Sequence, residues 1–140
     1  MLPILEHYFA AKSLYNKQMT PVCKAYGLTQ MELTILLFLA NNPDCNTAAQ
    51  IVKCRNLTKS HVSISVKSLQ EKGLLSCFYE TGDRKTVRLR LSGKAAGIVA
   101  DGRSAQEAFG RALLRGFSQE EATLLQSFME RIRKNMSVGE

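Results

Sequence analysis

The sequence has little of what enzymes and metal proteins usually require. Only two of its 140 residues are histidines, His7 and His61, and no two cysteines show the CxxC spacing of a zinc site. It contains no glycine-rich phosphate loop, no nucleophile elbow and no paired-carboxylate motif. The sequence therefore predicts a protein that is not an enzyme and that holds neither a metal nor another cofactor.

Long apolar runs are also missing. No stretch approaches the length of a membrane span, and residues 1–7 lack the basic and then apolar regions of a secretory signal peptide. The four cysteines are scattered, unlike those of a dense disulfide framework. We therefore expect a cytoplasmic protein with reduced thiols and no membrane partner.

What the sequence does have is a concentrated positive charge. The net charge is +7 with a pI near 9.4, which suggests an anionic partner, and the hydrophobic content of 45% is ordinary for one globular domain. The segments before residue 53 and after residue 90 are nearly neutral. Almost all of the excess lies between them, where three acidic residues face Lys53, Arg55, Lys59, Lys67, Lys72, Arg84, Lys85, Arg88 and Arg90.

Capping signals place four helices in the first half of the chain. Mixed helical spacings predict a first helix over residues 2–26, ending near Gly27. Capping boxes at residues 29–32 and 47–50 begin a second helix that runs to about residue 41 and a short third one. Thr58 is a natural N-cap for a fourth helix that continues to Gly73, its predicted C-cap.

The second half begins with a change from helical to alternating patterns. Residues 75–79 and 87–91 read as paired strands joined by a loop at 81–86. Ser92 then caps a long helix to about Gly116, and a capping box at residues 118–121 begins a last helix that ends near Met136. The predicted fold is mainly α with a small β wing: a winged helix-turn-helix over residues 28–91, between dimerisation helices at 1–27 and 92–140, in one compact chain.

The fourth helix has two different faces. At 100° per residue, Val62, Ser65, Val66 and Leu69 form a narrow packing face, while small polar side chains, one lysine and Ile64 point outward. The major groove of B-DNA admits one α-helix and presents donors, acceptors and thymine methyls to it. We therefore predict contacts with double-stranded DNA from Thr47, Thr58, Lys59, Ser60, His61, Ser63, Ile64 and Lys67.

The hairpin adds a second set of cations. Arg84 and Lys85 at its tip can reach an adjacent minor groove, whose negative potential attracts them. Arg88 and Arg90 lie on one face of the second strand, and Arg88 is also predicted to contact DNA. Asp83 would repel phosphate if it were unpaired, so we expect it to orient Arg84 or a neighbouring cation through a salt bridge.

The last helix carries an apolar stripe. Leu125, Phe128, Ile132 and Met136 recur at spacings of three and four residues, and such a stripe needs burial. An intramolecular core is one cover for it. A partner chain is the other, and we predict a homodimer interface that includes Leu5, Leu125, Phe128 and Ile132.

Several motifs resemble those of the MarR family of bacterial winged-helix regulators, over nearly the whole chain. They are Gly-Leu-Leu at 73–75, Gly-Asp-Arg-Lys at 82–85 and the run from Val87 to Ala95. The resemblance implies a homodimer on a pseudo-palindromic operator. It assigns Ser60, His61, Ser63 and Lys67 to the recognition helix and Asp83 and Arg84 to the wing. Lys85, Ile64 and a glycine two residues early after Ser92 depart from the family pattern, which leaves the operator sequence open.

The resemblance also implies a small aromatic or phenolic effector, bound between the dimer helices and the winged domain. Tyr8, Phe9, Tyr15 and Met31 are the predicted lining, although core packing explains them equally well. The predicted function is a sequence-specific DNA-binding regulator, a repressor released by such an effector. Two alternatives stay open: a winged helix that contacts an acidic protein, and a thiol-based redox sensor that uses Cys23 or Cys54.

Overall fold

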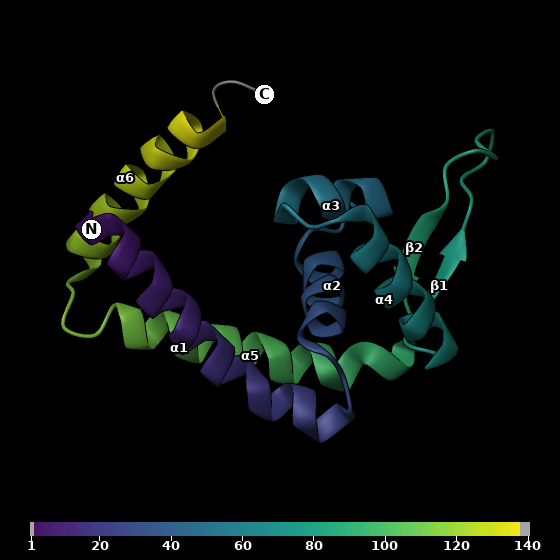
Figure 1. The fold of residues 1–140 in the computed structure, drawn as a ribbon, viewed down its shortest axis with the longest axis horizontal. Coiled ribbons are helices and arrows are strands. Elements are labelled where there is room, and N and C mark those ends of the chain that lie inside the picture. The colour runs from purple at the N-terminus through teal and green to yellow at the C-terminus, as the bar shows by residue number, and fades with distance from the viewer. Residues whose placement is uncertain (1, 138–140) are drawn as a thin grey trace.

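The computed structural model describes residues 2–137, so the outer ends of the first and last predicted units, residues 1 and 138–140, lie outside it. Its elements in chain order are α1 (Pro3–Tyr26), α2 (Gln30–Asn41), α3 (Ala48–Arg55), α4 (Lys59–Glu71), β1 (Leu75–Phe78), β2 (Arg88–Leu91), the 3₁₀-helix η1 (Gly93–Ala95), α5 (Ala96–Leu113) and α6 (Gln119–Ser137) (Figure 1). The predicted fold class, mainly α with a small β wing, is confirmed.

Four of the predicted helix starts are confirmed by their hydrogen bonds. At α2 the hydroxyl of Thr29 accepts from the amide of Glu32, whose carboxylate accepts from the amide of Thr29. The same reciprocal box begins α3 at residues 47–50 and α6 at residues 118–121. Thr58 caps α4 by accepting from the amide of His61 at 3.4 Å. These bonds satisfy donors that every helix leaves free in its first turn.

Three predicted helix boundaries are wrong. α4 ends at Glu71 with Lys72 as its cap residue, one position before the predicted Gly73, which instead takes the left-handed φ of 73° beyond the end. Ser92 does not cap a long helix with its side chain, because its hydroxyl donates to the carbonyl of Gly73 at 2.7 Å. The short η1 begins there instead, and α5 follows it and ends at Leu113 rather than Gly116.

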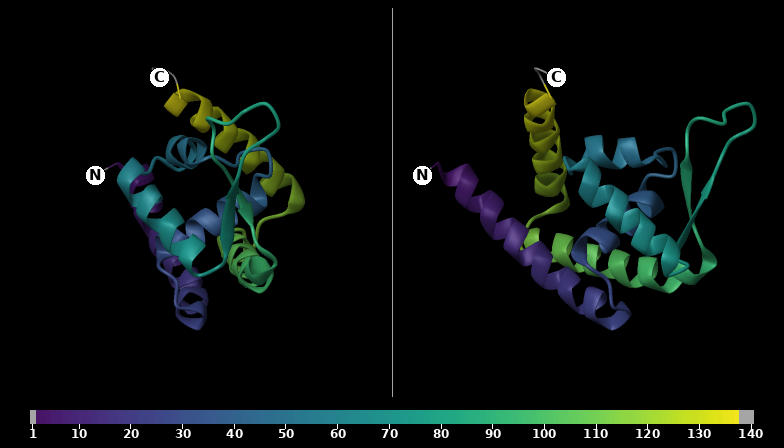
Figure 2. Two further views of the ribbon diagram at one scale, coloured as in Figure 1. Left: turned by 90° about the vertical axis from the view of Figure 1, so that its right-hand side faces the viewer. Right: turned by 45° about the vertical axis from the view of Figure 1, so that its right-hand side comes forward.

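The two strands form an antiparallel wing. Leu75 pairs with Leu91 and Phe78 with Arg88, which leaves residues 79–87 as the connecting loop. In the right view of Figure 2 this loop extends beyond the helices. The strand pair therefore carries the tip residues away from the core.

The core is centred on α2, which lies between α4 and α5 (Figure 1). Seven consecutive or nearly consecutive α2 residues are buried, and the α3, α4 and wing residues Ile51, Val62, Leu69 and Leu89 close around them. α1 packs along α5 on the other side of α2. This arrangement holds α4 with its packing face inward and its opposite face in solvent.

α6 extends away from the remaining helices (Figure 1), and none of its described residues is buried. No single helix among residues 2–137 is long and apolar enough to cross a membrane. α1 and α2 reach that composition only as a pair, with a 98° bend between them.

Candidate nucleic-acid interface

The solvent face of α4 has the composition that its helical periodicity predicts. Val62, Ser65, Val66 and Leu69 are buried, while Ser60, His61, Ser63, Ile64 and Lys67 are exposed. Ile64 is 67% exposed, so one aliphatic side chain stands among these polar groups. A helix that presents short polar groups, one cation and one isolated aliphatic group can approach base edges closely.

A recess borders this face on the side of the wing. It has a volume of about 610 Å³ and lies between α3, α4 and the two strands. Its apolar walls come from all three elements, and Lys59 and Lys67 stand among its polar lining residues. The remaining lining residues are Ala48, Ala49, Val52, Ser63, Val66, Gln70, Cys77, Val87 and Leu89. The exposed face of α4 therefore lies beside this recess, and Lys59 and Lys67 stand at its edge.

The wing tip exposes Arg84 and Lys85, as predicted, but the expected role of Asp83 is wrong. No ion pair among residues 2–137 joins Asp83 to Arg84 or to a neighbouring cation. Instead, the Asp83 carboxylate accepts from the amides of Lys85 at 3.0 Å and Thr86 at 3.1 Å. The bonds from Thr86 and then from Lys85 lower the pKa of Asp83. Because backbone amides lie closer than any guanidinium, Asp83 folds the tip and leaves Arg84 pointing outward.

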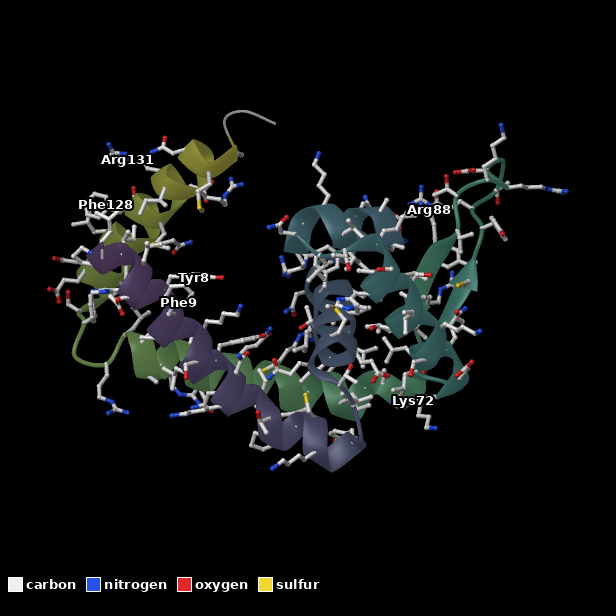
Figure 3. All side chains as sticks on the ribbon, in the orientation of Figure 1. Tyr8, Phe9, Lys72, Arg88, Phe128 and Arg131 are labelled. Atoms are coloured by element: carbon white, nitrogen blue, oxygen red, sulfur yellow. The ribbon has the colours of Figure 1, made fainter. Side chains whose placement is uncertain are left out.

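Arg88 is half-buried at the start of β2, where the connecting loop joins the paired strands (Figure 3). Its Nη1 donates to Oδ1 of Asn46 at 2.8 Å, and its Nε lies 3.4 Å from the carboxylate of Glu80, an ion pair without hydrogen-bond geometry. The amide of Leu89 donates to the carbonyl of Asn46 at 2.8 Å. Arg88 and Asn46 therefore fasten the wing to the segment before α3. Sequence reasoning missed Asn46, since nothing in its local pattern marks it.

Three other predicted contact residues lie close to helix starts. Thr47 is half-buried and its hydroxyl is engaged with Gln50 as the cap of α3. Thr58 caps α4 and is exposed, and Lys59 beside it is exposed too. The outward α4 residues, Thr58 and the wing tip are thus all exposed, and together they are called the recognition surface, while Thr47 and Arg88 are half-buried.

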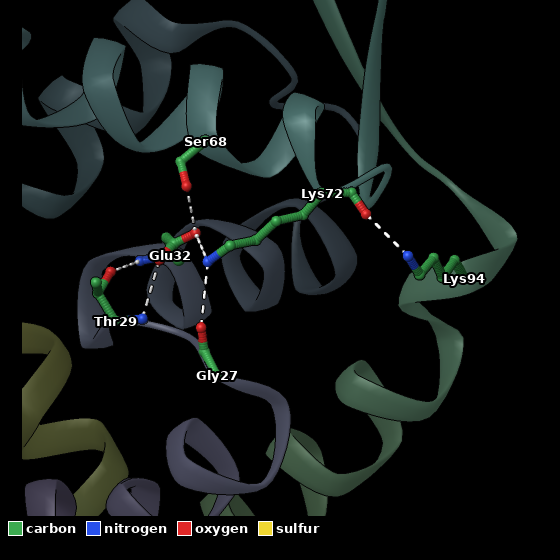
Figure 4. A network of polar contacts seen from close by, with 6 residues as sticks. All are labelled: Gly27, Thr29, Glu32, Ser68, Lys72 and Lys94. Atoms are coloured by element: carbon green, nitrogen blue, oxygen red, sulfur yellow. Dashed lines mark hydrogen bonds and ion pairs between the residues drawn. The ribbon is translucent and has the colours of Figure 1, made fainter.

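A polar network lies between α4 and the start of α2 (Figure 4). Glu32 on α2 is only 3% exposed, and its Oε2 accepts from Nζ of Lys72 at 2.8 Å and from the hydroxyl of Ser68 at 3.0 Å. Burial by itself raises the pKa of Glu32. The hydrogen bonds from Lys72, from Thr29 and from Ser68 outweigh that effect, so the pKa is lowered. Sequence analysis identified Glu32 only as a capping residue, because Lys72 is 40 residues away in the chain.

The four predicted effector residues have different surroundings. Tyr8 and Phe9 are exposed near the start of α1, with their rings edge to face at 5.2 Å. Tyr15 packs against Phe109 of α5 and accepts a hydrogen bond from Gln106. Met31 is half-buried against the core. These contacts explain Tyr15 and Met31 by packing, whereas no element within residues 2–137 covers Tyr8 and Phe9.

The cysteines differ sharply in access. Cys23 is buried, and burial raises the pKa of its thiol, which opposes the thiolate form that a redox sensor needs. Cys54 and Cys77 are exposed. Among residues 2–137, no cluster of histidine, cysteine, aspartate or glutamate could hold a metal ion.

The predicted dimer residues lie at the opposite end of the molecule from the wing. Figure 3 places Phe128 on α6 and Tyr8 and Phe9 on α1 at one end of the molecule, and Arg88 at the other end. Leu5, Leu125 and Phe128 are exposed, and Ile132 is half-buried. The apolar stripe on α6 is therefore largely exposed in the part of the chain that the structure describes.

Known proteins with similar sequences and folds were found. Residues 26–76 match the model of the MarR family. A regulator of Bacillus subtilis, the uncharacterized HTH-type transcriptional regulator YdgJ, is 25% identical over 115 residues, which cover 82% of this chain and 68% of that protein.

Two of the similar solved structures are complexes with DNA. A MarR-family regulator from Listeria monocytogenes, complexed with a 26mer DNA, has a TM-score of 0.84 at 16% identity and covers 97% of this chain and 89% of its own. The MepR–DNA complex of S. aureus has a TM-score of 0.77 at 17% identity, with 98% and 97% covered. At these identities the likeness establishes a shared fold from α1 to α6.

Proposed function

Because the chain is a winged helix-turn-helix protein of the MarR family, a family of transcriptional regulators and not of enzymes, we propose that it represses transcription in the cytoplasm. In this proposal two copies bind a pseudo-palindromic operator. Each copy inserts α4 into a major groove and its wing tip into the neighbouring minor groove.

The observation that carries the proposal is the joint exposure of two cationic elements on one surface. The outward residues of α4, with Lys67 among them, and the tip cations Arg84 and Lys85 are all exposed within one short, positively charged segment. Solvated charges alone do not require that arrangement. A helix that fits a groove, with cations beside it at the reach of an adjacent groove, is what duplex recognition requires.

Dimerisation is supported by the uncovered apolar stripe. Leu125 and Phe128 on α6 are 38% and 45% exposed, and Met129 is 53% exposed. Contiguous exposed apolar surface on a small chain usually marks an interaction site. A second copy that brings its own α6 and the start of α1 would bury the stripe on both sides at once, as a two-fold interface requires.

Release by a small aromatic effector is the remaining part of the proposal. Tyr8 and Phe9 are exposed at the same end of the molecule as α6 (Figure 3), so a second copy would turn them into the wall of an interface crevice. A ligand that binds there better in one arrangement of the two copies would shift the distance between the recognition helices.

Selection from a random-sequence duplex pool tests the proposal. We expect the full chain to enrich one two-fold symmetric sequence and to bind it in a gel shift despite an excess of scrambled competitor. A Lys67→Ala/Ser63→Ala variant should lose the preference, whereas Arg111→Ala, an exposed α5 substitution, should keep it. If the wild-type chain enriches nothing but is captured by acidic proteins, its basic surface serves protein contact instead.

A further inference from the structure

Three helix ends converge on one ion pair, whose carboxylate is buried and whose ammonium group comes from a half-buried lysine. The carboxylate of Glu32 lies in the first turn of α2, Lys72 is the cap residue of α4, and Nζ of Lys72 also donates to the carbonyl of Gly27, the cap residue of α1, at 3.2 Å. Figure 4 shows the three segments around the pair. One ammonium group therefore holds together the end of α1, the start of α2 and the end of α4.

The charges are placed where the helix dipoles favour them. A carboxylate is stabilised at the positive N-terminal end of a helix and a cation at the negative C-terminal end. Glu32 occupies the first kind of position, and Lys72 occupies the second kind for both α1 and α4. The pair thus fits only when these three ends are arranged as they are here, which makes it sensitive to the tilt of α4.

Lys72 is also connected to the dimer frame, the name used here for the proposed dimerisation helices α1, α5 and α6. Nζ of Lys94 in η1 donates to the backbone carbonyl of Lys72 at 3.1 Å, and η1 continues directly into α5. α5 packs along α1, whose exposed start belongs to the proposed dimer surface. Lys72 therefore touches the frame on both sides, through Gly27 on α1 and through Lys94 before α5.

We propose that Glu32 and Lys72 are positioning residues that fix the angle of α4 against the dimer frame and so set the spacing of the two recognition helices on the operator. This inference rests on the proposed function. Removal of either member leaves the outward face of α4 intact and lets the helix shift as a body. The protein then binds the operator less tightly, because the two recognition helices of a dimer must be separated by the same distance as the two half-sites.

Glu32 separates this role from direct contact with DNA. At 3% exposure, under the packing face of α4, it cannot reach a phosphate or a base. Its carboxylate adds no favourable long-range attraction to DNA, so loss of its charge should if anything strengthen electrostatic binding. Any loss of operator affinity in Glu32→Gln must therefore act through the position of α4.

The experiment measures operator and scrambled-duplex affinities of Glu32→Gln, Lys72→Met and the double variant by fluorescence anisotropy. The probes are the duplex that the wild-type chain selects and variants of it with one base pair added or removed between the half-sites. We expect each single variant to lose roughly three- to thirtyfold in operator affinity. Scrambled-duplex affinity should stay within about twofold, and the preference for one half-site spacing should weaken. The double variant should be no worse than the singles, because the two act as one unit.

Matched controls remove the simpler explanations. Glu71→Gln removes an exposed carboxylate next to Lys72, and Lys53→Met removes an exposed lysine outside the network; neither should change the spacing preference. Binding is measured below the thermal midpoint of each variant, and Ser68→Ala, which removes only one bond to Glu32, replaces any variant that does not fold. Equal losses on operator and scrambled DNA, or an unchanged spacing preference, would overturn the inference. A wild-type chain that selects no duplex would overturn the proposed function first.

Discussion

The salt dependence of DNA binding can be worked out from which cations the fold exposes. Lys59, Lys67, Arg84 and Lys85 are exposed on the recognition surface, whereas Arg88 is turned inward to Asn46. A dimer presents each exposed cation twice. If each of these neutralises one phosphate, the slope of log K against log salt concentration is about −7. Between about 50 and 200 mM salt, affinity should then fall roughly ten-thousandfold.

The tip cations supply half of that slope. An Arg84→Ala/Lys85→Ala variant should bind with a slope of about −4, since four phosphate contacts per dimer are lost. Its thermal stability should stay unchanged, because both side chains are exposed and Asp83 folds the loop through backbone amides. Fluorescence anisotropy titrations of the selected duplex over a salt series measure both slopes.

Arg88 provides the contrast. Its replacement by methionine should lower the thermal midpoint, because Asn46 and Glu80 lose their partner, while the slope stays near −7. Lys12→Ala/Lys17→Ala on the exposed side of α1 should change neither quantity. The assignment of the recognition surface is refuted if the wild-type slope is shallower than about −3, or if the tip variant and the α1 variant behave alike.

Three further predictions concern the dimer interface, the packing of α5 and the stability that the Glu32 ion pair provides. Phe128→Asp places a charge in the exposed α6 stripe, so sedimentation should find a monomer that no longer binds the operator, and a variant that stays dimeric would contradict the proposed interface. At Gly102 an added Cβ would lie 2.7 Å from a methyl of buried Leu37, whereas at Gly97 its nearest neighbour would be 3.6 Å away. Gly97→Ala should therefore raise the thermal midpoint through helix propensity, worth about 1 kcal/mol, and Gly102→Ala should lower it through overpacking of about 1–3 kcal/mol; equal midpoints would show that Leu37 moves freely. The pKa of Glu32 is lower in the folded than in the unfolded chain, so its contribution to stability is complete above the unfolded pKa and is lost as pH falls through the folded one. Urea unfolding across the acid range should show a weaker pH dependence for Glu32→Gln, and an unchanged profile would mean that the pair contributes nothing.

Much of the fold could be predicted because its signals are local. The capping boxes at Thr29 and Thr47 are made within four residues, so sequence alone specifies both partners. The alternation at residues 87–91 and the wheel of α4 follow from the periods of strand and helix. The boundaries failed where a distant group competed, as at Ser92, whose hydroxyl bonds to Gly73 across the start of the wing.

Features of the recognition surface also divide into those set by local sequence and those set by distant contacts. Sequence by itself determined that α4 has an outward face of small polar groups with Lys67, and that Arg84 and Lys85 occupy a hairpin tip, since both follow from position within one element. It did not determine which charges are free.

Only the tertiary structure decided that Arg88 turns inward to Asn46, that Asp83 is used by its own loop, and that Glu32 meets Lys72 beneath α4. A charged side chain takes the nearest partner that compensates its lost hydration, and packing of the helices alone decides which partner that is.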